Sequence, residues 1–190
     1  MKNQKEKFEK LYSLESEGIE LSTVWNFGSR EHGFGSHVFH GNCIPQVVEQ
    51  CILRYSKKGD KILDSMSGSG TTLDVSKKLG RKCLAFDISP IPTRNDLKKA
   101  DSAKLPLKDN SVSMIFIHLP YWNMVKYSSE KEDLSRKSLE GFYQKLNDIF
   151  RELKRVLKKD GTCWVNLGDT YSGSGGTSQN YNGSCLEKRK

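Results

Sequence analysis

A loop rich in serine and glycine, residues 65–70, separates an apolar segment from a helical pattern and limits the folds open to this chain. Residues 61–63 predict a short strand, which Asp64 follows, and residues 71–79 predict a helix that ends at Gly80. Glycines let such a loop approach a ligand closely, and the helix N-terminus favours a negative group. The glycine spacing fits neither a dinucleotide fingerprint nor a phosphate loop, so we expect a ligand with a carboxylate and no diphosphate. An ordinary flexible turn is the alternative.

The rest of the 190-residue chain continues to alternate strands and helices, which is typical of a parallel α/β sheet. This length is enough for one domain with a real core. We predict a doubly wound, Rossmann-like sheet, which the short C-terminal part could leave incomplete. The expected elements are helices at 45–55 and about 139–157, and strands at 83–86, into Asp101 and Ser102, at 113–117 and, after a turn at 159–161, at 162–167.

Composition divides the chain into three parts. Residues 1–22 form a charged extension that we expect to be helical, residues 23–170 the folded domain, and residues 171–190 a flexible tail rich in glycine and serine. No apolar run reaches the roughly 20 residues needed to span a bilayer, and the N-terminus lacks a secretory signal. We therefore expect a cytoplasmic protein with no membrane partner.

Charge and cysteine usage narrow the class of partner. The net charge of +8 favours a polyanion such as nucleic acid. The five cysteines are odd in number and no pair is two residues apart, which argues against a disulfide framework and a zinc site. We expect reduced thiols and no bound metal.

Three carboxylates follow predicted strands: Asp64, Asp87 and Asp101. Ligands bind open α/β sheets at the carboxyl ends of the strands, where these side chains should gather. Asp87 lies 23 residues after Asp64, a spacing suited to hydrogen bonds from ribose hydroxyls, and Asp101 could accept from an adenine amine. The alternative is that each aspartate only caps a loop.

The fourth predicted strand ends in a run of unusual composition, residues 118–123, with the sequence HLPYWN. Aromatic faces at this edge could stack on a flat substrate such as a base extruded from a duplex. The alternative is a hydrophobic turn that closes over the core.

Taken in order, these segments resemble the DNA amino-methyltransferases, which methylate N4 of cytosine or N6 of adenine with S-adenosylmethionine (SAM). Residues 62–72 resemble the family's "LDPFxGSGTT" loop, and residues 118–122 resemble its "(D/N/S)PP(Y/F)" motif, closest to the "SPPYW" form. Residues 155–161 are similar to "RVLKPGG", Gly168-Asp169 to "GD", and 40–46 to the segment that covers the methionine end of SAM.

The resemblance implies a role for individual residues and names DNA as the partner. The implied catalytic residues are His118, Pro120 and Tyr121, and the implied base-stacking residues are Tyr121 and Trp122. The implied cofactor-binding residues are Asn42, Asp64, Ser67, Gly68, Ser69, Gly70, Thr71, Asp87, Ile88 and Asp101.

The resemblance also implies a mechanism in which the flipped base stacks on Tyr121. The first motif side chain and a backbone carbonyl near Leu119 accept the amine hydrogens. Here His118 replaces the usual Asp, Asn or Ser, and Leu119 replaces the first proline. Neutral imidazole can accept one hydrogen bond whereas imidazolium cannot, so activity should fall at acidic pH.

Three functions stay open on the sequence. The first is a DNA amino-methyltransferase, with N4 of cytosine preferred over N6 of adenine. The second is an RNA amino-methyltransferase, and the third is a SAM-binding half or remnant with weak or no catalysis. In the third case a second polypeptide would supply the target-recognition region. A dehydrogenase does not fit the glycine spacing.

Overall fold

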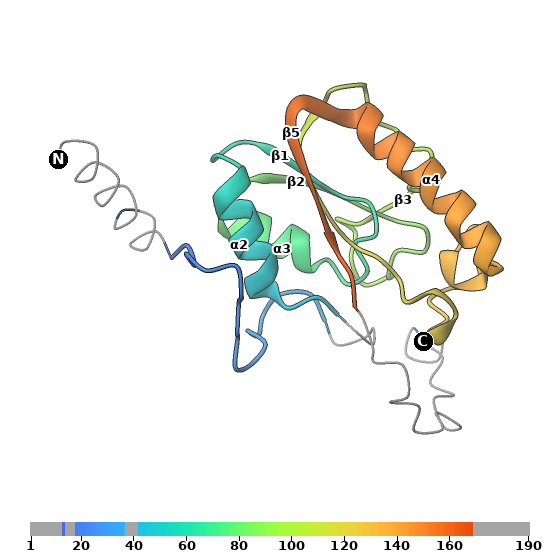
Figure 1. The fold of residues 1–190 in the computed structure, drawn as a ribbon, viewed down its shortest axis with the longest axis horizontal. Helices are drawn as coiled ribbons and strands as arrows, with labels where there is room; N and C mark the ends of the chain where they lie inside the picture. Colours follow the sequence, from blue (N-terminus) through green and yellow to red (C-terminus); the bar gives the residue numbers. More distant parts are fainter. Residues whose placement is uncertain (1–12, 14–17, 37–41, 169–190) are drawn as a thin grey trace.

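The computed structural model describes residues 13, 18–36 and 42–168, which form a five-stranded parallel sheet with helices on both faces (Figure 1). The strand order is β3-β2-β1-β4-β5. The strands are β1 (Lys61–Asp64), β2 (Lys82–Asp87), β3 (Lys98–Lys99), β4 (Val112–His118) and β5 (Leu157–Asn166). The helices are α2 (Pro45–Tyr55), α3 (Thr71–Lys78) and α4 (Leu139–Val156), with short 3-10 turns η1 (Trp122–Met124) and η2 (Leu134–Arg136). The predicted fold class is confirmed.

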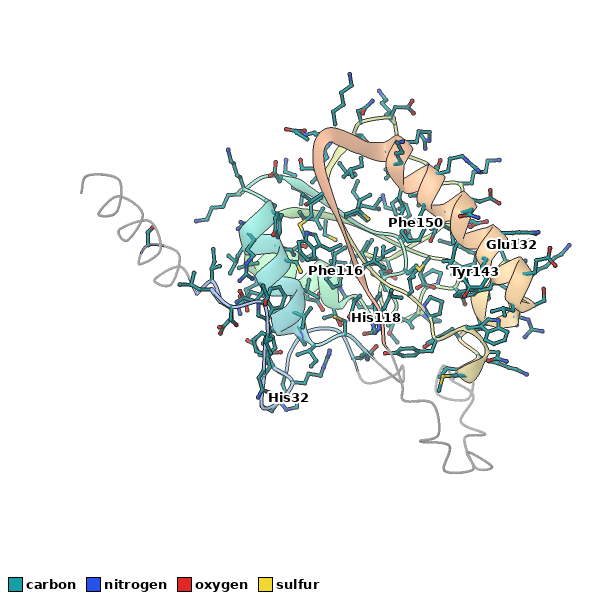
Figure 2. The ribbon with its side chains drawn as sticks, viewed as in Figure 1. His32, Phe116, His118, Glu132, Tyr143 and Phe150 are labelled. Atoms are coloured by element: carbon teal, nitrogen blue, oxygen red, sulfur yellow. The ribbon has the colours of Figure 1, made fainter. Side chains whose placement is uncertain are left out.

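Alternating side chains of β4 fill two separate cores, one on each face of the sheet. Met114 and Phe116 pack in a cluster with residues of α2 and α3. Ile115 and Ile117 pack with residues of α4. His118 is two residues beyond Phe116, so the strand directs it to the side of α2 and α3, at the edge of the sheet (Figure 2).

The strand order places a topological switch point between β1 and β4. From β1 the chain proceeds outward to β2 and β3, and from β4 it proceeds in the opposite direction to β5. A crevice opens outside the carboxyl ends of the strands at such a point. The loop after β1 and the motif that begins at His118 both leave the sheet there.

Two expected elements differ in detail. β3 ends at Lys99, before Asp101, because the Asp101 carboxylate accepts the Ala103 N–H at 2.9 Å and turns the chain away from the sheet. The expected turn at 159–161 lies within β5 as an irregularity in pairing. Val112 of β4 is opposite Leu157, but Met114 is opposite Thr162, so β5 has extra residues between these pairs.

The segment 18–36 packs on α2. Ile19 is buried, and the Gln50 side chain accepts the Glu20 N–H and donates to the Gly18 carbonyl. Contact with the domain therefore begins by residue 18, and the expected boundary at residue 23 stays a prediction. The expectations for residues 1–12, 14–17, 40–41 and 169–190, the tail and Cys185 included, lie outside the described residues. No helix in the described ranges is long and apolar enough to cross a membrane.

Candidate functional site

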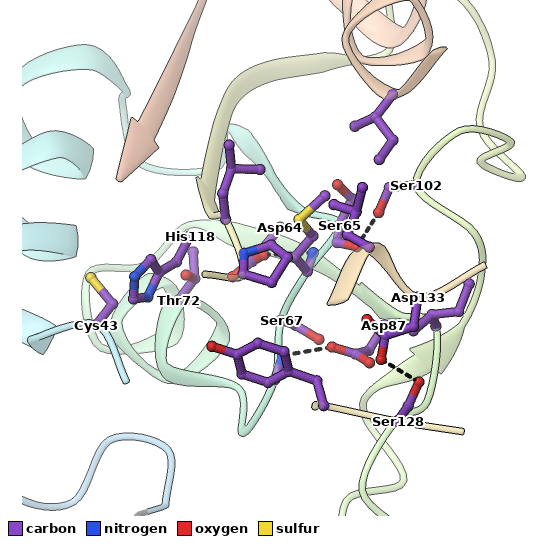
Figure 3. Close-up of a pocket in the computed structure, with 18 of the residues that line it drawn as sticks. Cys43, Asp64, Ser65, Ser67, Thr72, Asp87, Ser102, His118, Ser128 and Asp133 are labelled. Atoms are coloured by element: carbon purple, nitrogen blue, oxygen red, sulfur yellow. Dashed lines mark hydrogen bonds between the residues drawn. The ribbon is translucent and has the colours of Figure 1, made fainter. Parts of the chain in front are cut away.

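A single pocket at the switch point brings together most of the predicted site residues (Figure 3). The loop after β1, the end of β2, the motif after β4 and one face of α4 all contribute to its wall. The predicted residues that line it are Asn42, Asp64, Ser67, Gly68, Ser69, Thr71, Asp87, Ile88, Asp101, His118 and Pro120. Gly70, Tyr121 and Trp122 lie outside the lining.

The glycine loop is fixed by backbone contacts that leave its serine hydroxyls available. Ser67 N–H donates to the Phe86 carbonyl at 2.9 Å, and Gly70, the N-cap residue just before α3, has a φ of +89°, which favours glycine. The hydroxyls of Ser65, Ser67 and Ser69 are buried and have no hydrogen-bond partner among the described residues. Buried polar groups are normally hydrogen-bonded, so these hydroxyls fit a polar ligand in the pocket.

Asp64 lies at the base of this loop and is only 4% exposed. Its Oδ1 accepts the Met66 N–H at 3.0 Å. Burial raises the pKa of the Asp64 carboxyl to about 7, and the nearby Asp87 charge adds to this effect. Hydrogen bonds from the Thr72 side chain and the Met66 backbone lower the same pKa in part. A cationic ligand group would stabilise the ionised form.

Asp87 ends β2 and holds two loops together. Its Oδ2 accepts the Gly68 N–H at 2.9 Å, and its Oδ1 accepts the Ser89 N–H at 2.9 Å. Asp87 therefore fixes the shape of the glycine loop, and its predicted contact with a ribose stays a prediction.

Asp101 has a partner that the sequence analysis missed. Lys145 of α4 lines the pocket, and its Nζ lies 2.6 Å from Asp101 Oδ2 and 3.2 Å from Glu132 Oε2. Its side chain is 12% exposed. The adenine amine expected at Asp101 would thus share the carboxylate with an ammonium group. Lys145 lies between Phe142 and Ile149 on the apolar side of the helix. A lysine at such a position is the sequence feature that could have identified it.

The loop from 127 to 134 supplies a second unpredicted wall. Tyr127, Ser128, Glu132, Asp133 and Leu134 line the pocket. The buried Asp133 carboxylate accepts the Ser128 hydroxyl at 2.7 Å and the Ser135 N–H at 2.8 Å. No motif marked this loop in the sequence, because its shape depends on one buried aspartate rather than on a repeated pattern.

The motif after β4 places His118 in the lining and its aromatic neighbours beside it. His118 Nε2 lies 3.3 Å from the Tyr121 hydroxyl, and burial lowers the pKa of the imidazole. The Trp122 indole N–H donates to the Lys137 carbonyl at 3.1 Å. Leu119 N–H donates to the Asn166 carbonyl at 3.2 Å, so β5 anchors the start of the motif.

Two arginines support the pocket from outside. Arg94 pairs with both oxygens of Asp74 at 2.8 Å and donates to the Ser69 carbonyl at 3.3 Å. Arg30 donates to the backbone carbonyls of Cys43 and Phe34. Both side chains join segments distant in sequence, so they belong to the framework of the glycine loop.

Comparisons with known proteins agree with this arrangement. The model of a family described as DNA methylase (N6_N4_Mtase) matches residues 1–91 and 112–188. The type II methyltransferase M.Cfr9I of Citrobacter freundii is 42% identical over 66 residues, which cover 35% of this chain and 22% of the relative. M.SfiI of Streptomyces fimbriatus is 36% identical over 69 residues, which cover 36% of this chain and 16% of the relative.

A longer but more distant match extends over most of the chain. M.BamHI of Bacillus amyloliquefaciens is 22% identical over 154 residues, which cover 80% of this chain and 29% of the relative. The chain thus spans less than a third of the length of these curated relatives.

Proposed function

Because this chain belongs to the N6/N4 DNA methylase family, we propose that it transfers a methyl group from SAM to an exocyclic base amine in DNA. We place N4 of cytosine ahead of N6 of adenine. One observation carries the proposal: the loop after β1 and His118 at the end of β4 face the same pocket at the switch point. A cofactor held by the loop would therefore be next to the group that receives the substrate.

The residues of the pocket fit SAM, which supplies an electrophilic methyl group when bound. The buried hydroxyls of Ser65, Ser67 and Ser69 offer unsatisfied donors and acceptors. The Asp64 carboxylate complements the positive charge of the methionine ammonium, and we propose that Asp87 accepts hydrogen bonds from the ribose hydroxyls. We propose that Asn42, Thr71, Gly68, Ile88 and Asp101 complete the cofactor site.

His118 supplies the acceptor that the chemistry needs. An exocyclic base amine is a weak nucleophile because its lone pair is delocalised into the ring. A hydrogen bond from the amine to a neutral imidazole orients the nitrogen, and burial lowers the pKa of His118 so that the ring is neutral near pH 7. Most of the catalysis is then positioning. We propose the ring of Tyr121 as the stacking surface, with Pro120 shaping the loop and Trp122 beside it.

The first test measures transfer of labelled methyl from SAM to unmethylated genomic DNA, followed by nucleoside analysis. His118→Ala is the test variant and His32→Ala is the control, because His32 is exposed and does not line the pocket. We expect label in N4-methylcytosine with wild type and the control variant, and at least about a 100-fold loss in His118→Ala.

Other outcomes identify the alternatives. Label in N6-methyladenine would keep the function and change the base. Label in RNA but not in DNA would overturn the choice of substrate. SAM binding without any transfer would favour a cofactor-binding protein without catalysis. This is the second candidate function, because His118 replaces the acceptor that is usual in the motif.

A further inference from the structure

One polar contact joins the side chains of His118 and Tyr121, and it has a consequence for the imidazole proton. His118 Nε2 lies 3.3 Å from the Tyr121 hydroxyl, and the rings meet edge to face with centroids 5.7 Å apart and an interplanar angle of 87°. Within the described residues, Nδ1 of His118 has no hydrogen-bond partner. Nε2 therefore has a hydrogen-bonding neighbour in the protein, whereas Nδ1 has none among the described residues.

A neutral imidazole has one donor nitrogen and one acceptor nitrogen. If the Tyr121 hydroxyl donated to Nε2, the only acceptor of the ring would be occupied and Nδ1 would carry the proton. The ring could then accept nothing from a base amine. If Nε2 carries the proton and donates to the Tyr121 oxygen, Nδ1 is left as the free acceptor. Only this second tautomer is compatible with the proposed role of His118.

We propose that the Tyr121 hydroxyl is a positioning group that holds His118 in the tautomer with a proton on Nε2 and a free acceptor on Nδ1. This inference rests on the proposed function and deepens it, because it assigns the atom that receives the substrate amine. It concerns the hydroxyl of Tyr121 rather than its aromatic face.

The surroundings hold the Tyr121 ring in place for this contact. Gly168 packs so closely that a Cβ atom there would contact Tyr121 Cε1 and lie 3.0 Å from its hydroxyl oxygen. Leu119 N–H is bonded to the Asn166 carbonyl, and Met124 N–H donates to the Tyr121 carbonyl at 3.0 Å. His118 itself is paired with Asn166 in the β4–β5 register. The hydroxyl is thus presented to Nε2 by backbone contacts on both sides.

The effect of the Tyr121 hydroxyl can be distinguished from the effect of its aromatic face. His118 lines the pocket whereas Tyr121 does not. Loss of the hydroxyl in Tyr121→Phe keeps the aromatic face and the packing against Gly168. A Tyr121 that acted only through its face would therefore tolerate this substitution without any effect on His118.

The direct test is 15N and 1H NMR of the full chain labelled at histidine nitrogens, at pH 8, with His118→Gln to assign the ring. We expect His118 as the Nε2–H tautomer, with an Hε2 resonance protected from solvent exchange. That resonance should exchange at least about 10-fold faster in Tyr121→Phe and stay unchanged in the control Tyr143→Phe, because Tyr143 is exposed on α4. An Nδ1–H tautomer in wild type, or unchanged exchange in Tyr121→Phe, would overturn the proposal.

A kinetic arm links the tautomer to the reaction. Tyr121→Phe should lower kcat/KM by about 5- to 10-fold, the usual effect of one hydrogen bond. In a His118→Asn background the same substitution should have no further effect, because an amide oxygen accepts without a tautomer. The NMR result does not depend on activity, so a failure of methyl transfer alone would count against the proposed function and leave the tautomer assignment standing.

Discussion

Lys145 Nζ lies 2.6 Å from Asp101 Oδ2 inside the pocket, with side-chain exposures of 12% and 27%. The pair joins α4 to the end of the β3 strand region and also engages Glu132 at 3.2 Å. Asp64 and Asp87 line the same pocket, so the ammonium offsets a local excess of negative charge. We therefore expect a ligand at this end of the pocket to meet a cation as well as a carboxylate.

We predict that Lys145→Met destabilises the ligand-free chain by about 1 to 3 kcal/mol, because it leaves the partly buried Asp101 carboxylate unpaired. The double variant with Asp101→Asn should recover about 1 kcal/mol of this loss. Urea unfolding of the four proteins of the cycle measures the coupling. Additive effects of the two substitutions would show that the pair contributes nothing to stability.

Arg94 offers a second test of the framework. We predict that Arg94→Met lowers the free energy of unfolding by about 2 kcal/mol and weakens SAM binding several-fold, because Arg94 joins Asp74, Asp96 and the Ser69 carbonyl. The matched control is Arg151→Met, whose pair with Asp148 is exposed at 76% and 57%. The control should change stability by no more than about 0.5 kcal/mol. Equal effects in urea unfolding and calorimetric titration would contradict a special role for Arg94.

Sequence patterns predict those parts of this molecule that depend on local order. The strand–loop–helix unit around Asp64 and the apolar run of β4 are local, and both appear in the structure as expected. The ends of β3 and β5 were less predictable, because a carboxylate turn at Asp101 and a break in the β4 register depend on tertiary contacts.

The residues of the site likewise divide into those that a local motif predicts and those that depend on tertiary contacts. The loop residues that line the pocket carry a sequence motif and were predicted, whereas Lys145 and Asp133 were not. Lys145 reaches Asp101 across 44 residues, and Asp133 acts by folding its own loop around Ser128. A lysine on the apolar face of α4 is unusual, but the pattern does not identify its partner, and no pattern marks Asp133, so both contacts are known only from the structure.

Gly35 provides a steric test of the segment that covers the glycine loop. It has a φ of +61°, and a Cβ atom there would contact the Thr71 hydroxyl and lie 2.6 Å from the Ser69 hydroxyl. Gly33 has a φ of +90° but open space around it, so Gly33→Ala is a matched control for backbone strain. We predict that Gly35→Ala weakens SAM binding by about 10-fold more than Gly33→Ala does, because only Gly35→Ala displaces the loop hydroxyls. Similar losses in calorimetric titration would mean that strain alone explains both.

The buried Asp64 predicts an unusual pH dependence of stability. Its pKa is raised to about 7 in the folded chain, above the value near 3.9 of an unfolded aspartate. The folded state therefore holds more protons between these values, and the contribution of Asp64 to stability falls as pH rises from about 4 to 7. Asp64→Asn should raise Tm at pH 8 by at least about 2 °C, which is roughly 1 kcal/mol here, and have less effect at pH 5.

Calorimetry of the ligand-free protein at both pH values measures this difference. Asp148→Asn is the control, because Asp148 is 57% exposed. A gain for Asp64→Asn that is the same at pH 5 and pH 8 would contradict a raised pKa for Asp64.

His118 sets the last expectation, the pH profile of methyl transfer at saturating SAM. Burial lowers the pKa of its imidazole below the ordinary value of about 6.5, so the acceptor form persists from pH 8 to below that value. kcat should be level over this range and fall roughly 10-fold per pH unit below the lowered pKa, because imidazolium has no acceptor. Cys43 on the same pocket wall has a pKa raised to about 12 by burial, so it stays an uncharged thiol throughout.

The variant His118→Asn distinguishes the acidic fall in kcat from the titration of other groups. Its amide oxygen accepts at every pH, so kcat should stay level through the acidic range whatever its absolute value. Asp64 also titrates near pH 7, but we expect its ionisation to affect SAM binding, and so to appear in the KM for SAM rather than in kcat. An acidic limb in kcat that persists in His118→Asn would exclude His118 as the acceptor of the base amine.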